Sequence, residues 1–394
     1  MTRWVVVGGG TAGCVVAGRL SEQPDNEVTV VEAGPQGAGA VSASYLDDLD
    51  VPGALWPDIT VHDGDGSPRP YPQGRGLGGS SAVNGGVVSG EGPAGMLPAE
   101  SLSPVHLGVI DRALLAVAPA AVPARLSWID GRRVSTAEVY LGPARARPNL
   151  RVVTDVRVDR VLTRKGMVAG VALANGERLY SDAVVCTAGA LQTPALLLRS
   201  GVRVTGLGEG LTDHPSRMVE IELVAGAGDD PAALVTGVVL RRGPVEIVTM
   251  NHLGPRRPDT AALLVGVLRT DRRGSVTLDP GRGDDPAAAP VADCGPLDPA
   301  DAASLAEGVA HAEALLASAP LRDLVADVRV AAMLGGYAHV SSSCRMGTVV
   351  DANGGVIGHP GLFIADASVF PAIPESGTYL PVVALAEHLA ARWR

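Results

Sequence analysis

The N-terminal part of the chain alternates between short apolar runs and a stretch with helical spacing. The runs at residues 4–7 and 28–31 are rich in valine and short enough to be buried strands, and a glycine turn followed by a helical stretch separates them. This order predicts a strand, a helix and a second strand, the unit from which parallel sheets are built. Residues 36–75 are rich in proline, glycine and aspartate and lack periodicity, so we expect an extended loop there.

The middle of the chain changes to the period of β-strands. Runs from residue 150 onwards, with a hairpin signal at Asn175-Gly176, predict short strands, and a helix is expected at 190–199. Helical spacing predicts further helices at 107–117 and 298–317, and residues 361–394 are expected to form a strand, a loop and a helix. Alternating runs that predict an antiparallel sheet lie at 219–224, 234–240, 245–250, 263–268 and 275–278.

Length and charge narrow the classes of function. A chain of 394 residues is long enough for two domains, and 50 glycines with only 3% aromatic residues fit a glycine-rich α/β protein. The net charge of -10 argues against a nucleic-acid partner, because phosphate binding needs clustered lysine and arginine. We therefore expect a small-molecule ligand.

Cysteine usage and hydropathy carry two further expectations. The four cysteines are widely spaced and form no CxxC pair, so we expect neither a metal site nor a disulfide framework. The first residue leads almost directly into the first expected strand, and no apolar run reaches the ~18 residues of a spanning helix. The sequence thus predicts a cytoplasmic protein without a transmembrane segment.

The first motif with chemical content is VVVGGGTAG at residues 5–13. Gly8, Gly10 and Gly13 have the GxGxxG spacing, which permits a tight turn, close approach of a pyrophosphate and packing of the helix on the strand. Glu32 ends the second expected strand, where a carboxylate accepts hydrogen bonds from a ribose diol. A dinucleotide site is therefore expected. The acid at Glu32 disfavours NADP but does not separate NAD from FAD.

Four further segments resemble one family of flavoenzymes. GRGLGGSSAVNGG (74–86) and TAGALQTPALLLRSGV (187–202) resemble the two signatures of the glucose-methanol-choline (GMC) oxidoreductases. GLGEGLTDHP (206–215) and LFIADASVFPAIP (362–374) are similar to later elements of that family and follow in the same order. The resemblance implies a Rossmann-like α/β FAD-binding domain of the GMC type and an α+β substrate domain on an antiparallel sheet.

The resemblance also implies a division of the chain into domains. The FAD-binding domain would be discontinuous, made of residues 1–90, 140–215 and 340–394. The substrate-binding domain would take residues 91–139 and 216–339.

The implied cofactor is FAD, held without a covalent bond, because no histidine lies in the ten residues before Gly74. Asn84 would lie near the isoalloxazine, Val158 would contact the adenine through its backbone, and Asp366 would hold a ribityl hydroxyl. Asp366 can instead cap the turn that follows it. The expected FAD-binding residues are Gly8, Gly10, Thr11, Ala12, Gly13, Glu32, Ala33, Gly78, Gly79, Ser80, Asn84, Gly85, Val158, Asp366, Ala367 and Thr378.

The candidate catalytic base is His339, in the segment YAHVSSSCRMG (337–347), which resembles a histidine element of the family. A neutral imidazole accepts a proton near neutral pH, as removal of an alcohol proton requires. His214 matches a family position that looks structural, and we assign it no catalytic role. The serines at 341–343 lack a GxSxG elbow, which excludes a hydrolase.

The chain departs from the family where a second polar residue, His or Asn, is usual. The aligned position is Gly377, and Thr378 and Tyr379 are the nearest hydroxyl-bearing candidates for the missing partner. Glu375 or Ser376 could serve if the loop is displaced, and plain loop packing is the alternative interpretation. The chain is also shorter than is general in the family, which suggests a more open site, a bulky substrate or a partner that completes the pocket.

The resemblance implies an enzyme that oxidises an alcohol CH-OH group to a carbonyl. Its electron acceptor would be oxygen, a quinone or another redox carrier, and two segments resemble the subgroup associated with the carrier mycofactocin. Two alternatives stay open at this stage. One is a redox-silent lyase similar to the hydroxynitrile lyases of the family, and the other is a flavoprotein without chemistry of its own that serves a partner.

Overall fold

The computed structural model describes residues 1–36, 41–64, 66–90 and 95–393. One part of the fold is a parallel five-stranded sheet in the order β23-β13-β1-β2-β9. These strands are Leu362–Ile364, Ala183–Cys186, Thr2–Val7, Asn26–Val31 and Leu150–Val153. The predicted strand, helix and strand at the N-terminus are confirmed, and strands from distant parts of the sequence complete the sheet.

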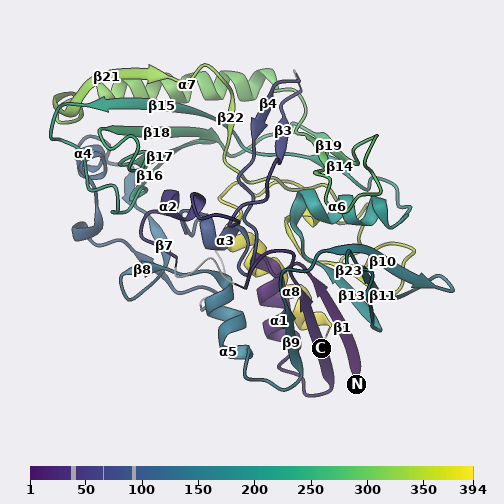
Figure 1. Cartoon of the computed structure of the whole chain (residues 1–394). Helices are drawn as coiled ribbons and strands as arrows, with labels where there is room; N and C mark the ends of the chain where they lie inside the picture. The colour runs from purple at the N-terminus through teal and green to yellow at the C-terminus, as the bar shows by residue number, and fades with distance from the viewer. Residues whose placement is uncertain (37–40, 65, 91–94, 394) are drawn as a thin grey trace.

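Helix α1 (Thr11–Leu20) connects β1 to β2 and packs with the C-terminal helix α8 (Tyr379–Arg392), as Figure 1 shows in its lower half. The apolar positions of both helices and of β1 share one core, in which Val6, Val15 and Leu389 are fully buried. Since α1 directly follows the carboxyl end of β1, its N-terminus lies at the edge of the sheet where parallel strands typically bind ligands.

A small antiparallel sheet adjoins this layer. It contains β10 (Val158–Arg164), β11 (Met167–Leu173) and β12 (Arg178–Tyr180), in that order. The turn between β11 and β12 includes Gly176, whose φ of +89° suits glycine, so the predicted hairpin is confirmed. The predicted helix follows β13 as α6 (Gly189–Arg199).

The upper part of the molecule in Figure 1 is an antiparallel sheet with helix α7 (Pro299–Leu316) lying along it. The strand order is β21-β15-β18-β17-β16-β6, with β22 beside β15. Asp298 caps α7 by accepting a hydrogen bond from the amide of Ala300, as its position before the helical run predicts. The strands are Val325–Val330, Pro215–Leu223, Thr260–Val267, Val245–Met250, Val238–Arg242, Ala121–Pro123 and Gly335–Gly336.

A further sheet corrects two expectations. Its order is β14-β19-β20-β3-β4, with strands Glu209–Leu211, Gly274–Thr277, Val291–Asp293, Thr60–His62 and Pro68–Pro70. The run at 275–278 therefore belongs to this sheet and not to the large antiparallel one. The expected loop at 36–75 also contains β3, β4 and helix α2 (Tyr45–Leu49), and its residues 37–40 and 65 lie outside the described residues. Pairing of β3 with the distant β20 stabilises strands that are too short to show periodicity.

The other elements are short. The predicted helix at 107–117 begins two residues late, as α4 (Val109–Val117), and the strand expected from residue 234 begins only at Val238. The remaining elements are α3 (Ser80–Val83), β5 (Ala99–Ser101), η1 (Pro104–His106), β7 (Arg125–Ile129), β8 (Arg132–Arg133), η2 (Ala137–Leu141), α5 (Gly142–Ala144), η3 (Leu321–Leu324) and η4 (Ala367–Val369).

Candidate active site

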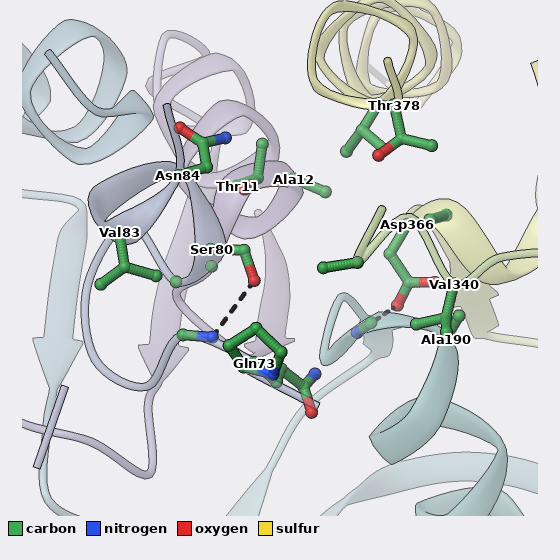
Figure 2. Close-up of a pocket in the computed structure, with 18 of the residues that line it drawn as sticks. Thr11, Ala12, Gln73, Ser80, Val83, Asn84, Ala190, Val340, Asp366 and Thr378 are labelled. Atoms are coloured by element: carbon green, nitrogen blue, oxygen red, sulfur yellow. Dashed lines mark hydrogen bonds between the residues drawn. The ribbon is translucent and has the colours of Figure 1, made fainter. Parts of the chain in front are cut away.

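A cavity of about 380 Å³ lies where the glycine loops meet the ends of the parallel strands and one face of the antiparallel sheet. Figure 2 shows Thr11, Ala12 and Asn84 on one side of it and Thr378 and Asp366 on the other. Of the residues expected to bind FAD, all but Gly13 and Gly78 are part of its lining, and so are His339, Thr378 and Tyr379. Residues predicted from separate motifs are thus brought together in one place.

The first glycine loop has the geometry that its spacing predicts. Gly8 has a φ of +100°, and a Cβ atom on Gly13 would lie 1.9 Å from the Gly8 carbonyl oxygen, so the start of α1 packs directly on the loop. Gly10 is the N-cap of α1 and contributes no side-chain cap. The first-turn amides of α1 therefore face the cavity without a side-chain acceptor, which suits an anionic group.

The second glycine loop contacts the first through backbone atoms, and the Thr11 hydroxyl also donates to the Gly78 carbonyl at 3.4 Å. The amide of Gly78 donates to the carbonyl of Gly9 at 2.8 Å, and a Cβ atom on Gly79 would lie 2.8 Å from the Cα of Gly10. Ser80 then begins α3, and its hydroxyl accepts a hydrogen bond from the Gly74 amide at 3.2 Å (Figure 2). Gly79 has no room for a side chain at this contact, and the two loops together form one polar rim of the cavity.

Glu32 connects the two loops to β2. Its carboxylate accepts hydrogen bonds from the amides of Gly9 and Gly34, each at 2.7 Å, and of Gly76 at 3.1 Å. Burial raises the pKa of this carboxyl group, although the three amides act in the opposite direction. Glu32 also lines the cavity, so the lone pairs that the amides leave free can accept from a ribose hydroxyl.

Asp366 caps the turn that follows it, as one of the two interpretations predicts, and its contact with a ribityl hydroxyl stays a prediction. It accepts from the amide of Ser368 at 2.9 Å as the cap of η4, and it also accepts from the Thr193 hydroxyl at 2.6 Å and the Gly189 amide at 2.9 Å. Figure 2 shows its carboxylate at the cavity. Burial raises its pKa. An Asp held by three donors is a fixed acceptor for a ligand hydroxyl.

His339 lies on the cavity wall and contacts a second histidine. Its Nδ1 is 3.0 Å from Nδ1 of His214, whose Nε2 is 3.0 Å from the carbonyl oxygen of Pro374. A carbonyl oxygen can only accept, so His214 carries its proton on Nε2, and its Nδ1 accepts from His339. The Nε2 atom of His339 is then unprotonated. It lies 3.9 Å from the position of a Cβ on Gly377, at the cavity.

The protein environment keeps both imidazoles neutral. Burial lowers the pKa of His339 to about 4, and a nearby carboxylate, Asp213, opposes this shift. Burial and then the neighbouring His339 lower the pKa of His214 to about 3. Neutral imidazole is the form that accepts a proton, so His339 is a base with a free lone pair at neutral pH.

The backbone of His339 is fixed by a buried ion pair. Its amide donates to Oδ1 of Asp213 at 2.8 Å, and Oδ2 of the same carboxylate accepts from Nη2 of Arg69 at 3.0 Å. The side chain of Asp213 is fully buried and that of Arg69 is nearly so. The position of the imidazole therefore depends on a charged group that sequence reasoning did not connect to it.

The residues around Gly377 differ in what they offer to the site. The Tyr379 hydroxyl donates to Ser127 and to the Val134 carbonyl, each at 3.4 Å, in the core beneath α8. This geometry argues against the expected role of Tyr379 as the second polar group. Thr378 lines the cavity and stays a candidate contact of the cofactor.

The two other candidates near Gly377 are directed elsewhere. Glu375 forms an exposed ion pair with Arg269 at 2.7 Å, and the Ser376 hydroxyl donates to the Gly377 carbonyl at 3.1 Å. Neither side chain lines the cavity.

Sequence reasoning missed several lining residues. Glu246, Val248 and Leu264 come from the cavity-facing side of β17 and β18, and Tyr337 and Ser89 come from loops. The alternation of side chains along β17 could have shown that Glu246 and Val248 share a face of the sheet. It could not have shown that this face borders the same cavity as the two glycine loops. His214 was set aside as structural, and only the fold reveals its contact with His339.

Metal ligands and membrane spans were searched among the described residues. No group of three or more His, Cys, Asp or Glu side chains there could hold a metal ion, and each of the four cysteines is buried and unpaired with another. In the same part of the chain, no helix combines the length and apolar character needed to cross a bilayer.

Comparison with sequence families gives matches along most of the chain. Residues 124–216 and 270–386 match two profiles that are both described as GMC oxidoreductase, and residues 6–62 match one described as an NAD(P)-binding Rossmann-like domain. A GMC-type oxidoreductase of Rhodococcus erythropolis is 30% identical over 504 residues, covering 98% of this chain and 97% of that protein. Because 504 positions exceed the 394 residues of this chain, that relative contains segments that the chain lacks.

Further relatives carry more specific names. A 5-(hydroxymethyl)furfural oxidase of Methylovorus sp. is 29% identical, with 98% of this chain and 97% of the relative covered. Among solved structures, a pyridoxine 4-oxidase from Mesorbium loti superimposes with a TM-score of 0.87 at 21% identity, covering 100% of this chain and 99% of the other. A formate oxidase superimposes with a TM-score of 0.84 at 20% identity, covering 99% and 98%. The two structures establish a common fold.

Proposed function

Because this chain belongs to the GMC oxidoreductase family, and is thus an FAD-dependent oxidoreductase, we propose that it oxidises the CH-OH group of a small alcohol to a carbonyl with His339 as the base. The observation that carries the proposal is the 3.0 Å contact between the Nδ1 atoms of His339 and His214 at the wall of the cavity, from which we infer that Nε2 of His339 is unprotonated. Two relatives named for oxidation of furan and pyridine alcohols support this substrate class. The enzyme acts on small molecules.

The cavity fits the parts of FAD. The helix terminus at Thr11 offers backbone amides for the pyrophosphate, and Gly79 lets the second glycine loop lie close beside it. Glu32 and Asp366 offer fixed acceptors for the ribose and ribityl hydroxyls. Val158 lines the same cavity, in keeping with an adenine contact. We propose that the predicted residues that line the cavity contact FAD, that Gly13 and Gly78 hold the two glycine loops around it, and that the attachment is non-covalent.

The proposed reaction divides between the cofactor and His339. Bound FAD supplies the acceptor of the hydride that leaves the carbinol carbon. His339 takes the hydroxyl proton at Nε2, and the C–O bond becomes a carbonyl as both hydrogens leave. His214 keeps the proton of His339 on Nδ1 and thereby holds Nε2 ready, which makes it a positioning residue.

The substrate side of the cavity is mostly apolar. Val248 and Leu264 extend from the antiparallel sheet, whereas Glu246 adds a carboxylate that is paired with Arg241 at 2.9 Å. An aromatic or alkyl primary alcohol fits such a wall. The bounds of the discontinuous FAD-binding domain and of the substrate domain stay predictions. The acceptor, whether oxygen, a quinone or a carrier, and the cytoplasmic location stay predictions.

The proposal is tested by anaerobic titration of the purified flavoprotein with 5-(hydroxymethyl)furfural, pyridoxine and simple primary alcohols. Wild type should lose the oxidised flavin absorbance near about 450 nm, which is a property of the cofactor. His339→Ala should retain FAD and reduce at least about 100-fold more slowly, because general-base catalysis contributes that much. His388→Ala, which removes an exposed imidazole from α8, is the matched control and should behave like wild type.

Two results would contradict the proposal. Flavin that stays oxidised with every alcohol would exclude alcohol oxidation and favour a redox-silent role. Reduction of His339→Ala at the wild-type rate would retain the reaction but remove His339 as its base.

A further inference from the structure

Gly377 leaves a space beside His339 that a hydroxyl group from another part of the chain borders. A Cβ atom on Gly377 would lie 3.7 and 3.9 Å from Cε1 and Nε2 of His339 and only 2.8 Å from the Oγ of Ser89. A side chain at 377 would therefore collide with the Ser89 hydroxyl. The absence of a side chain at Gly377 thus leaves room for the Ser89 hydroxyl. Ser89 and His339 face the same space.

The Ser89 hydroxyl has an uncommitted proton. Its oxygen accepts a hydrogen bond from the amide of Gly377 at 2.8 Å, which uses an acceptor site and not the O–H donor. Among the hydrogen bonds of the described residues, none has the Ser89 hydroxyl as donor. Ser89 also lines the cavity, so this donor is available to a ligand there.

An alcohol at this site needs a donor of this kind. While His339 removes the hydroxyl proton, negative charge develops on the alcohol oxygen, and its lone pairs can accept a hydrogen bond. Before the proton has moved, His339 Nε2 is an acceptor and cannot supply one. We propose that Ser89 is a catalytic residue that donates a hydrogen bond to the substrate oxygen and takes the role that a side chain at 377 would otherwise fill. This inference rests on the proposed function.

In this assignment Ser89 keeps its proton throughout. The alcohol proton passes to His339 and the hydride passes to the flavin, as in the reaction described above. The hydrogen bond from Ser89 strengthens as charge builds on the oxygen, which accelerates reduction more than it strengthens binding.

The test is stopped-flow reduction of the flavin by 5-(hydroxymethyl)furfural without oxygen. Ser89→Ala should reduce about 10- to 100-fold more slowly, with an unchanged FAD content and an unchanged pH dependence, because the ionising base is still His339. Its melting temperature should fall slightly, because the Gly377 amide loses its acceptor. The deuterium isotope effect at the carbinol carbon should persist, since C–H cleavage still limits the rate. Ser376→Ala is the matched control: its hydroxyl lies next to Gly377 along the chain but outside the cavity lining, so its rate should stay within about twofold of wild type.

A double variant distinguishes loss of the hydrogen-bond donor from damage to the local structure. Gly377→Ser alone should be impaired, because its Cβ meets the Ser89 oxygen. Ser89→Gly combined with Gly377→Ser moves the hydroxyl to the other side of the same space and should recover reduction to within about tenfold of wild type. If the alcohol reduces the flavin of wild type and of Ser89→Ala equally fast, the role of Ser89 is wrong and the proposed function is unaffected. A double variant no faster than Ser89→Ala would also overturn it, and a wild type that no alcohol reduces would overturn the proposed function and this inference with it.

Discussion

At the scale of single residues, the protonation state of His339 follows from its contacts. The Pro374 carbonyl sets the tautomer of His214, and His214 in turn sets the tautomer of His339. Burial favours the neutral form of both rings. A histidine on the surface would be partly protonated near its usual pKa of ~6.5, so a part of it would be unable to accept a proton there. The pair therefore extends the pH range in which the base is available.

This arrangement predicts an unusual pH dependence. The lowered pKa of His339, about 4, means that the base form dominates at neutral pH and is lost as the pH falls through that value. The rate constant of flavin reduction by an alcohol should stay level down to about pH 5 and fall below it. Stopped-flow reduction across a pH series measures this directly. A decline that begins near ~6.5 would show that the imidazole behaves as an exposed one.

At the scale of elements, two glycine loops and one helix terminus form the polar rim. Each close approach occurs where a side chain has no room, most severely at Gly13. Glycine is needed where α1 and the loops are in backbone contact. The glycine spacing that predicts the site in the sequence therefore reflects the packing that builds the site.

Gly13→Ala should weaken FAD binding. The new methyl group would lie 1.9 Å from the Gly8 carbonyl oxygen, so α1 must shift away from the loop by more than a few tenths of an ångström, at a cost of about 1–3 kcal/mol. The purified variant should contain less FAD per chain than wild type, as absorbance and total protein would show. Gly142→Ala in α5, where the nearest atom is 3.5 Å from the new methyl, is the matched control and should keep its flavin. Full flavin content in Gly13→Ala would contradict the packing argument.

At the scale of the whole molecule, a buried charge network joins distant segments to the active site. Asp63 pairs with Arg69 at 2.9 Å and with Arg272 at 2.7 Å, and Arg69 also pairs with Asp213, which holds the backbone of His339. These side chains come from the β3–β4 region, from the segment after β14 and from the segment before β19. The network thus connects the sheet that sequence reasoning did not expect to the proposed base.

Arg69→Met should destabilise the protein by about 3–5 kcal/mol, because it leaves two buried carboxylates without one of their partners. It should also slow flavin reduction, since Asp213 holds His339 in place. Thermal denaturation and stopped-flow reduction measure the two effects. Arg269→Ala removes an exposed ion pair with Glu375 and should change the Tm little. Equal stability of the two variants would mean that the network contributes no more than a surface pair.

Local sequence patterns determined a large part of this protein. The spacing of Gly8, Gly10 and Gly13 and the acid at Glu32 predict the N-terminal unit, and the segment around His339 identifies the candidate base through its resemblance to the family. The hairpin at Asn175 and the capped helix after Asp298 follow from short-range turn and cap chemistry. These features depend on a few neighbouring residues, so they are visible in the sequence.

Only the tertiary structure decided which side chains meet at the site. His214 and His339 are 125 positions apart, and Ser89 and Gly377 are 288 positions apart, so no local pattern joins either pair. The direction of the Tyr379 hydroxyl and the pairing of β3 with β20 likewise depend on packing between distant segments. Sequence motifs therefore indicated the cofactor and the base, whereas the partners of that base depend on long-range contacts that only the folded chain brings together.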